Sequence, residues 1–332
     1  MKVVIQHAVG DPAWQPSVLA PPAVGDFARI AERHGYAGIA FTDHPAPTVR
    51  WTAAGGEGSA DPLVSLAYCA AVTSTLELMT FVLALPYHNP FRLAHQASTL
   101  DALSGGRLVL GLGTGYLRGE MRALGADPDG RLSSFDAVLE TMLEAWTSDS
   151  VSGSFPGPGA EPGTESPSGA GAGWLAREVH VQPPVVQRPH PPLWFHGNSA
   201  FGRARAAQYG AGWIGVLSSA ELAATMRTAH LPDLAAAAAA IAGLRKRCEA
   251  VGRDPGSVSA GLGGLWRMLD IRRGWDTGAM IDAASAAAEI GVDTMFATVC
   301  GDDAAVANDT IAAFGEQVVA VVAKEIQHEE HS

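Results

Sequence analysis

A regular alternation of short apolar segments with longer amphipathic segments is the feature that most constrains the fold of this chain. The short segments are nearly continuous apolar runs, which is typical of strands in a parallel sheet whose faces are covered by helices. The alternation predicts an α/β protein. The expected strands are Lys2–His7, Tyr36–Phe41, Leu76–Leu83, Arg107–Leu112, Leu193–His196, Gly212–Val216, either Ser257–Leu262 or Leu265–Ile271, and Val292–Ala297.

Helix start signals follow several of these strands. Asp61-Pro62 and Asn89-Pro90 each place a capping side chain before a proline at the first helical position. Apolar residues recur at helical spacing from Phe135 to Trp146 and give the clearest amphipathic helix. Further helices are expected over Val24–Gly35, from Ser199, and over Leu234–Val251, Ile281–Ile290 and Asp303–Ala323.

Eight strand–helix units fit a closed (β/α)8 TIM barrel, and residues 1–332 are a usual length for such a barrel as a single domain. An open doubly wound sheet is the alternative. Residues 152–173 consist mainly of Gly, Pro, Ser and Ala, with almost no large apolar side chain. We therefore expect a flexible surface loop there, inserted within the barrel.

Charge and cysteine content exclude several classes of protein. The formal net charge is −12, so the chain has no basic excess with which to displace counterions from nucleic acid. The three cysteines are far apart and form no Cys-x-x-Cys motif, which argues against a disulfide framework or a zinc site. The first apolar run is too short for a signal peptide, and Leu234–Leu244 is too short to span a membrane. We expect a cytoplasmic protein without metal, nucleic-acid or membrane partners.

In a barrel of this kind, polar residues just past the strand ends meet at the C-terminal face and are the candidates for chemistry. Asp43-His44 follows the second expected strand. A histidine exchanges a proton near neutral pH, and an adjacent carboxylate can orient its ring or raise its pKa. A hydrogen-bonded loop histidine without a catalytic role is the competing interpretation.

Two glycine-containing turns are candidates for cofactor binding. Gly111–Gly115 lacks the G-x-G-x-x-G spacing and the later acidic residue of a dinucleotide site, but its glycines would let the backbone approach a flat ring. His196–Ser199 lies where a strand turns into a helix, so its free N–H groups are suited to a phosphate. An ordinary tight turn and an ordinary N-cap would use the same residue types. Neither HExxH, GxSxG nor a P-loop occurs.

Taken together, these segments resemble the luciferase-like monooxygenase family, and within it the branch that uses coenzyme F420. They cover roughly the first two-thirds of the chain in order, and the LDALSGGR stretch at Leu100–Arg107 is the most specific. The resemblance is carried by Ala31–Tyr36, Phe41–His44, Leu85–Pro90, Leu100–Leu108, Gly111–Gly115, Pro189–Trp194, Gly197–Ser199 and Gly210–Trp213.

The resemblance implies a barrel that binds F420, or alternatively FMN, at its C-terminal face. The catalytic residue would be His44, against the reactive ring, with Asp43 beside it. A bulge with a cis peptide on the third strand would press on the back of the ring, a glycine turn would approach the cofactor, and the turn after the fifth expected strand would hold its phosphate. The cofactor-binding residues implied in this way are Thr80, Phe81, Val82, Leu83, Gly113, Thr114, Gly115, His196, Gly197, Asn198 and Ser199.

Two departures from the family pattern matter. His196 occupies a position where the family usually has glycine, which implies a bulkier phosphate loop or an additional donor. Tyr116 and Gly119 stand where the F420-dependent sugar-phosphate dehydrogenases show Glu and Asn, which argues against a sugar-phosphate substrate.

The expected function is that of an F420-dependent oxidoreductase that transfers a hydride to or from a small organic substrate, in a homodimer. An FMN-dependent two-component monooxygenase, supplied by a separate cofactor reductase, is the first alternative. A non-enzymatic flavin-binding barrel and a metal-dependent barrel hydrolase are weaker alternatives, because Asp43-His44 is present and no His-x-His follows the first strand.

Overall fold

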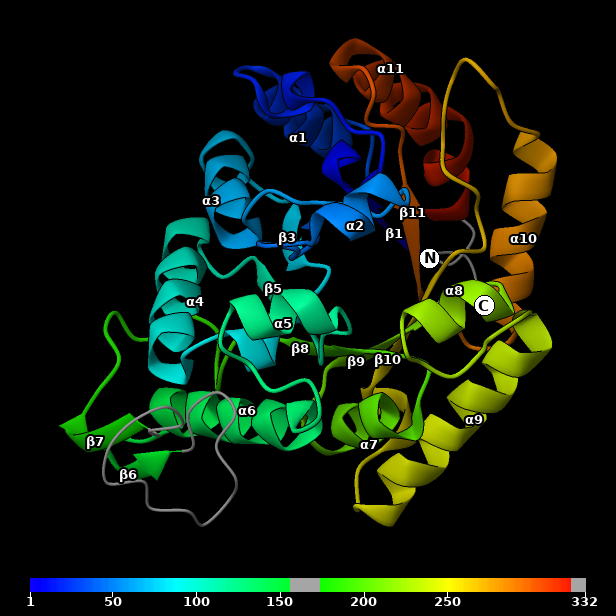
Figure 1. Cartoon of the computed structure of the whole chain (residues 1–332). Coiled ribbons are helices and arrows are strands. Elements are labelled where there is room, and N and C mark those ends of the chain that lie inside the picture. Colours follow the sequence, from blue (N-terminus) through cyan, green and yellow to red (C-terminus); the bar gives the residue numbers. More distant parts are fainter. Residues whose placement is uncertain (156–173, 324–332) are drawn as a thin grey trace.

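The computed structural model describes residues 1–155 and 174–323. Its main sheet is parallel, with the strand order β3-β2-β1-β11-β10-β9-β8-β5-β4 (Figure 1). β3 also pairs with β5, which closes the sheet. Since β3 and β4 both pair with β5, they are two parts of one barrel position. The predicted (β/α)8 barrel is confirmed.

The strands begin and end close to the predicted residues. The position predicted as Leu76–Leu83 is divided by a cis peptide between Phe81 and Val82, in the bulge that the family resemblance implied. Of the two candidates for the seventh position, the first is the strand, while Leu269 forms only an isolated bridge to Val299. The barrel strands are β1 (Lys2–Gln6), β2 (Gly38–Phe41), β3 (Glu77–Thr80), β4 (Leu83–Ala84), β5 (Leu108–Gly113), β8 (Leu193–His196), β9 (Gly212–Val216), β10 (Ser259–Gly263) and β11 (Thr294–Thr298).

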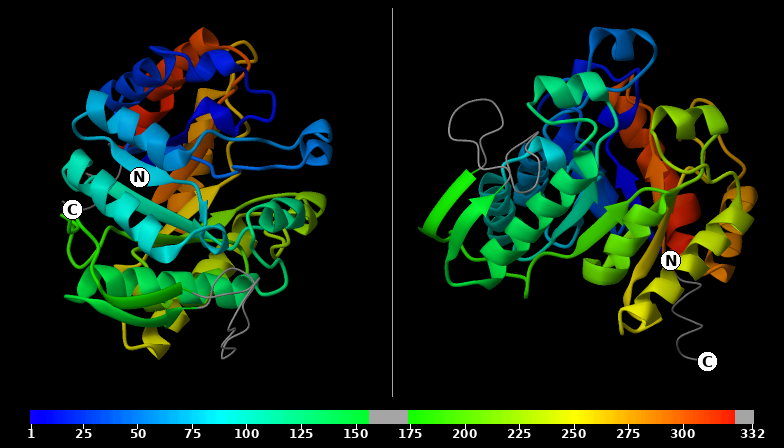
Figure 2. Two further views of the ribbon diagram at one scale, coloured as in Figure 1. Left: turned by 60° about the vertical axis from the view of Figure 1, so that its left-hand side comes forward. Right: turned by 60° about the horizontal axis from the view of Figure 1, so that its bottom comes forward.

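A ring of helices surrounds these strands, as two further views show (Figure 2). The predicted caps are present: the Asp61 and Asn89 side chains accept hydrogen bonds from the N–H groups of Val64 and Arg92. The ring consists of α1 (Ala23–Arg33), α3 (Pro62–Val72), α4 (Pro90–Ser104), α6 (Arg131–Thr147), α7 (Ala200–Tyr209), α9 (Leu234–Ala250), α10 (Thr277–Glu289) and α11 (Ala304–Phe314), which continues through a π-helical turn at Gly315–Val319.

Three short helices were not predicted. They are α2 (Val49–Ala53), α5 (Arg118–Ala123) and α8 (Ala220–Thr225). Each lies in a connection that follows a barrel strand, so each belongs to the face where the strands end. The site is therefore lined by loops that carry their own secondary structure.

The segment predicted as a loop over 152–173 needs a correction at its start. Ser152 to Phe155 lie in β6 (Val151–Phe155), which pairs antiparallel with β7 (Trp174–Val179) outside the barrel. Val151 is buried and pairs with Val179, so the strand begins where an apolar residue can pack. The prediction for residues 156–173 lies outside the described residues.

Two apolar layers stabilise the barrel. A small interior cluster includes Val4, Met79, Ile214 and Phe296. A much larger cluster fills the space between the strands and the helices. The segment Ala304–Ala323 is long and apolar enough, by length and composition, to cross a membrane. Its Phe314 and Val318 are fully buried, so it packs as one of the outer helices of the barrel.

Candidate active site

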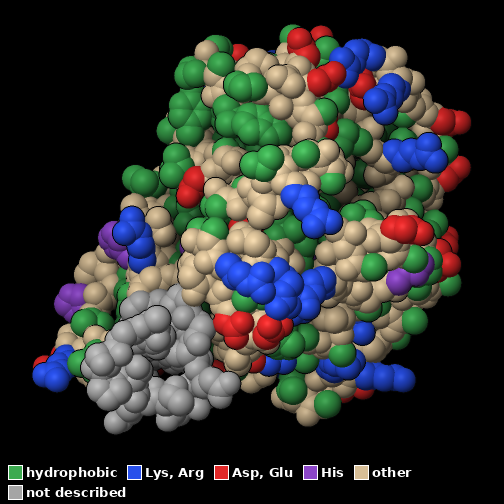
Figure 3. All heavy atoms as spheres, viewed as in Figure 1, with side chains coloured by type: hydrophobic (Ala, Val, Ile, Leu, Met, Phe, Trp, Pro, Cys, Tyr) green, Lys and Arg blue, Asp and Glu red, His purple; other side chains and the backbone are tan. Residues whose placement is uncertain are grey.

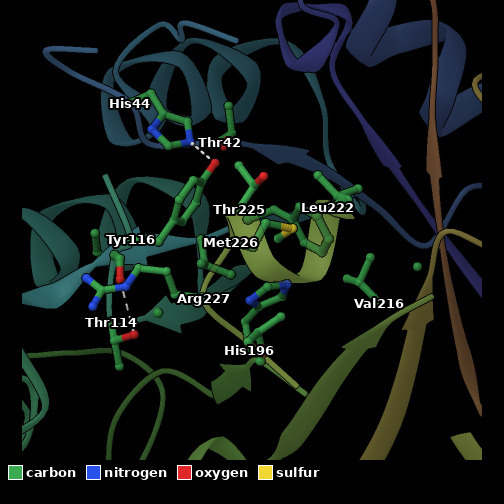
Figure 4. A pocket seen from close by; sticks show the side chains of 18 of the residues that line it. Thr42, His44, Thr114, Tyr116, His196, Val216, Leu222, Thr225, Met226 and Arg227 are labelled. Carbon is green, nitrogen blue, oxygen red and sulfur yellow. Dashed lines mark hydrogen bonds between the residues drawn. The ribbon is translucent and has the colours of Figure 1, made fainter. Parts of the chain in front are cut away.

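A cavity of about 860 Å³ opens at the C-terminal ends of the strands. This size suits a cofactor together with a small substrate, since ligand cavities commonly measure about 300–1,000 Å³. Residues from the ends of β1, β2, β4, β5, β8, β9, β10 and β11 line it, together with α2, α8 and the start of α6. Figure 4 shows His44 and Tyr116 on one side of this cavity and His196 and Val216 on another.

His44 follows β2, and both nitrogens of its ring lie within hydrogen-bond distance of a neighbouring side chain. Its backbone N–H donates to the Ser59 hydroxyl at 2.6 Å, which fixes the start of the loop. Its Nδ1 lies 3.0 Å from Glu120 Oε2, and its Nε2 lies 3.2 Å from the Tyr116 hydroxyl (Figure 4). When the imidazole is neutral with its proton on Nδ1, Nε2 accepts from Tyr116; when it is protonated, Nε2 donates to the tyrosine oxygen.

Glu120 on α5 is the buried carboxylate that orients this histidine. Its side chain is fully buried, which is unusual for a carboxylate unless its oxygens are paired. Oε1 accepts from the Ala46 N–H at 3.0 Å, and Oε2 accepts from the Tyr87 hydroxyl at 3.2 Å as well as contacting His44. The carboxylate therefore joins the loops after β2, β4 and β5.

Glu57 supplies a second carboxylate near the same ring. Its Oε1 lies 3.6 Å from His44 Nε2, and its backbone carbonyl accepts from Trp51 Nε1 at 2.8 Å. Burial raises the pKa of Glu57 to about 7, against an opposing effect of the His44 charge. Burial disfavours the charged form of His44, but the hydrogen bond to Glu120 and the charges of Glu57, Glu120 and Asp43 outweigh it and raise the pKa of His44. Glu57 therefore changes its protonation state near neutral pH, beside an imidazole whose protonated form is favoured.

Asp43 lines the cavity beside His44 but hydrogen bonds to other groups. Its Oδ2 accepts from the Ala84 N–H at 3.2 Å and lies 3.2 Å from His88 Nε2. It thus ties the end of β2 to β4, while its charge also favours protonated His44. His88 contacts Asp43, whereas the next residue, Asn89, caps α4.

The bulge and the glycine turn form one wall of the cavity. Phe81 and Val82 line it, whereas Thr80 and Leu83 are fully buried and do not. Gly113, Thr114 and Gly115 all line the cavity. A Cβ at Gly113 would lie 2.6 Å from Val82 Cγ2, and Gly115, at φ 68°, would place one 2.8 Å from the Tyr87 hydroxyl. Glycine is therefore required at both positions, because a side chain would clash with Val82 or Tyr87.

The turn between β8 and α7 contributes His196, Gly197 and Ser199 to the cavity. Ser199 is the N-cap of α7 and its side chain makes no capping bond, so the first N–H groups of the helix remain available to a ligand. Asn198 is buried and does not line the cavity: its amide group donates to the Val216 and Ala229 carbonyls and accepts from the Val216 N–H. It holds the turn in position.

Burial lowers the pKa of His196 to about 4, so its imidazole is neutral at pH 7. His7, a further histidine after a strand, stacks on Phe41 at 4.7 Å and lies outside the cavity. Burial lowers the pKa of His7 to about 3. Neither histidine is a substitute for His44 as a proton carrier.

Several cavity residues were not predicted from sequence: Trp51, Glu57, Tyr87, Tyr116, Arg131 and Arg227, with Glu120 directly behind His44. Tyr116 was noted only as a departure from the family pattern. The one available signal was position, because all of them follow the ends of barrel strands. Their types, however, are also common on solvated loops.

Comparison with known sequences identifies the family. A model of the luciferase-like monooxygenase family matches residues 1–267. An uncharacterized protein of Mycobacterium tuberculosis is 37% identical over 135 residues, which are 37% of this chain and 48% of that protein. The FMNH(2)-dependent dimethylsulfone monooxygenase of Pseudomonas putida is 26% identical over 187 residues, which are 54% of this chain and 45% of that enzyme. The chain spans about half the length of these curated relatives.

Solved structures share the fold over nearly the whole chain. The monooxygenase RslO1 from Streptomyces bottropensis has a TM-score of 0.70 at 18% identity, covering 96% of this chain and 99% of that one. An F420-dependent secondary alcohol dehydrogenase, solved with an F420-acetone adduct, has a TM-score of 0.71 at 16% identity, covering 96% and 98%. At such identities the likeness establishes the barrel alone. Because the family model covers residues 1–267, the chain belongs to the luciferase-like monooxygenase family.

Proposed function

We propose that this protein uses coenzyme F420 to transfer a hydride to or from a small organic substrate, with His44 as the group that carries the accompanying proton. The observation that supports this most directly is the environment of His44, which lines the cavity between Glu120 at 3.0 Å and Tyr116 at 3.2 Å. F420, when bound, supplies the hydride chemistry. The chain supplies the group that carries the proton and the residues that orient the reactants.

The cavity residues fit a flat ring that carries an anionic tail. The glycines at 113 and 115 keep one wall free of side chains where a Cβ would clash. Phe81 and Val82 would contact the ring, and the free N–H groups at the start of α7 would hold a phosphate. Arg131 lines the cavity with an Nε that is buried and has no partner among the described residues. An orphaned guanidinium nitrogen of this kind is consistent with a missing anion.

His44 can work in either direction of such a reaction. Oxidation of an alcohol releases a proton from the hydroxyl, which neutral His44 can accept at Nε2 while Glu120 stabilises the resulting imidazolium through Nδ1. Reduction of a carbonyl uses the reverse transfer. Tyr116 and Glu57 lie next to Nε2, so the proton can pass from the imidazole ring to either of them.

An FMN-dependent monooxygenase is the second candidate, because a curated relative at 26% identity is named as FMNH(2)-dependent. In that case a separate reductase would supply the reduced flavin, and Arg131 and the N–H groups at the start of α7 would hold the phosphate of FMN. His44 would again move a proton.

Titration of the purified protein with F420 and with FMN tests the proposal, with binding followed by quenching of cofactor fluorescence. We expect F420 to bind more tightly than FMN and to remain bound to the protein through gel filtration. Retention of FMN with loss of F420 would contradict the proposal and favour the monooxygenase.

A further inference from the structure

Two arginines at the mouth of the cavity have features that folding alone does not explain. Arg131 is the first residue of α6, a helix whose N-cap is Gly130 and which has neither a side-chain cap nor an acidic residue in its first turn. A cation at this end opposes the helix dipole. Its Nε is buried without a partner among the described residues, and its Nη1 makes only a long contact of 3.4 Å with the Pro128 carbonyl.

Arg227 has a backbone conformation that usually belongs to glycine. Its φ is 54°, and it lies directly after the C-cap residue of α8, Met226. Glycine is preferred at such a position because a side chain in the left-handed region costs about 1–2 kcal/mol. Arginine occupies this position instead, and its side chain lines the cavity (Figure 4). Strained residues of this kind concentrate at ligand sites.

The two side chains lie in a positive field that the nearby Asp129 offsets only in part. Burial, together with the charges of Arg227 and Arg118, lowers the pKa of Arg131 and outweighs the opposing effect of the Asp129 charge. Arg118 is already paired with Asp129 through two contacts of 2.7 and 2.8 Å. Within residues 1–155 and 174–323, no acidic side chain forms an ion pair with Arg131 or Arg227. Figure 3 shows a compact group of basic side chains on this face, in a protein whose net charge is −12.

Arg227 is connected to the turn that is suited to a phosphate. The next residue, Thr228, accepts a hydrogen bond from the Asn198 N–H at 3.0 Å. Thr228, Gly197 and Ser199 all line the same cavity as the two arginines. An anion that continues outward from this turn therefore meets Arg227, whereas the substrate end at His44 carries the carboxylates of Asp43, Glu57 and Glu120.

We infer that Arg131 and Arg227 form a subsite for a polyanionic group at the cavity mouth, and that this group is the tail of the deazaflavin cofactor, whose carboxylates follow its phosphate. This inference rests on the proposed function. Arginine suits the role because its guanidinium binds carboxylate and phosphate oxygens in a bidentate manner and stays charged. The subsite would select a cofactor by the charge of its tail and leave ring chemistry to the His44 end.

The test compares the dissociation constants of F420 and of Fo, the same ring system without the phosphate and glutamate tail. We expect the wild-type protein to bind F420 at least tenfold more tightly than Fo. Arg131→Gln and Arg227→Asn should each weaken F420 binding by about tenfold, as expected for a charge-assisted hydrogen bond, and change Fo binding less than about twofold. Added salt should weaken F420 binding to the wild type more than to either variant.

Arg122→Gln is the charge-matched control, because Arg122 lies on α5 next to this group but does not line the cavity. It should leave both dissociation constants unchanged. Arg227→Gly adds a control for folding: glycine relieves the positive φ, so its melting temperature should equal or exceed that of the wild type while F420 binding weakens.

Three outcomes would overturn the subsite: equal affinity of the wild-type protein for F420 and Fo, an Arg122→Gln effect as large as that of Arg131→Gln, or equal losses for both ligands in the variants. Each leaves the proposed function standing, since the ring still binds. Failure of F420 and Fo alike to bind, with FMN retained, would instead refute the proposed function and the tail subsite together.

Discussion

Replacing Glu57 by glutamine should make the protein more stable at high pH and leave its stability at low pH nearly unchanged. The side chain is only 23% exposed, and burial raises its pKa from 4.5 to about 7. A carboxyl group whose pKa is raised in the folded protein lowers the free energy of unfolding at any pH where the group ionises. Each tenfold change in proton affinity is worth about 1.4 kcal/mol, so the full penalty is on the order of 3 kcal/mol.

The pH window follows from these two pKa values. Below about pH 4.5 the carboxyl is protonated in both states, and the stability that its protonated form contributes is fully present. Between pH 4.5 and about 7 the unfolded chain loses the proton first, so the stability of the folded protein declines as pH rises. Above about pH 7 the loss is complete. Glutamine cannot ionise and avoids the decline.

Guanidinium denaturation of cofactor-free protein at pH 5 and pH 8.5 measures the effect. The gain in unfolding free energy from Glu57→Gln should be larger at pH 8.5 by about 2–3 kcal/mol, with similar m-values. Glu77→Gln is a suitable control, because Glu77 forms only a surface pair with Lys2. If the free energy of unfolding changed with pH in the same way for the wild type and Glu57→Gln, this would refute the view that Glu57 is protonated in the folded protein near neutral pH.

Three further predictions concern the other residues of the site. His44→Ala should lower turnover by about a hundredfold or more with little change in the cofactor dissociation constant, as expected for loss of an acid–base group. Asp43→Asn should lower turnover less, because the contacts of Asp43 are to Ala84 and His88. Loss of cofactor binding in His44→Ala would make the histidine a positioning residue. Glu120→Gln removes the charge at Nδ1 that raises the pKa of His44, so the pH–rate profile should move to lower pH, and an unmoved profile would contradict the pairing. Gly197→Ala, at φ 120°, should weaken cofactor binding more than it slows the loaded enzyme, as measured by separate binding and turnover assays; the opposite order would argue against the phosphate turn.

The barrel could be predicted from sequence because its strands are short apolar runs with helix signals after them. The predicted strand Gly212–Val216 is the observed β9, and Leu193–His196 is β8. Such runs are typical of strands that are covered by helices on both faces of a parallel sheet. The division of the third position into β3 and β4 was available only through the family resemblance, since Phe81 and Val82 look like any strand interior.

The environment of His44 could not be predicted in the same way. Glu120 is 76 positions further along the chain, and only the closed barrel brings its carboxylate to Nδ1. In sequence it is one acidic residue in a short helix, and such residues are usually solvated. For Asn198, by contrast, the sequence suggested a role that its side chain does not have. Its type and place suggested phosphate binding, but its amide group hydrogen bonds to the backbone of Val216. A polar side chain beside a ligand turn can serve the ligand or the turn, and the sequence does not distinguish them.

The departure at Tyr116 has a structural counterpart that links the chemistry to the charge distribution. Where the sugar-phosphate branch of the family has a glutamate, Tyr116 contacts Nε2 of His44, and the carboxylates come instead from Glu57 and Glu120. The His44 end of the cavity thus carries the carboxylates of Asp43 and Glu120 together with the carboxyl group of Glu57, whose pKa is raised to about 7, whereas Arg131 and Arg227 make the mouth basic. An anionic substrate would be repelled from the reacting end and attracted to the mouth. Under the proposed function, this arrangement would favour a neutral substrate at His44 and an anionic cofactor whose tail lies toward the arginines.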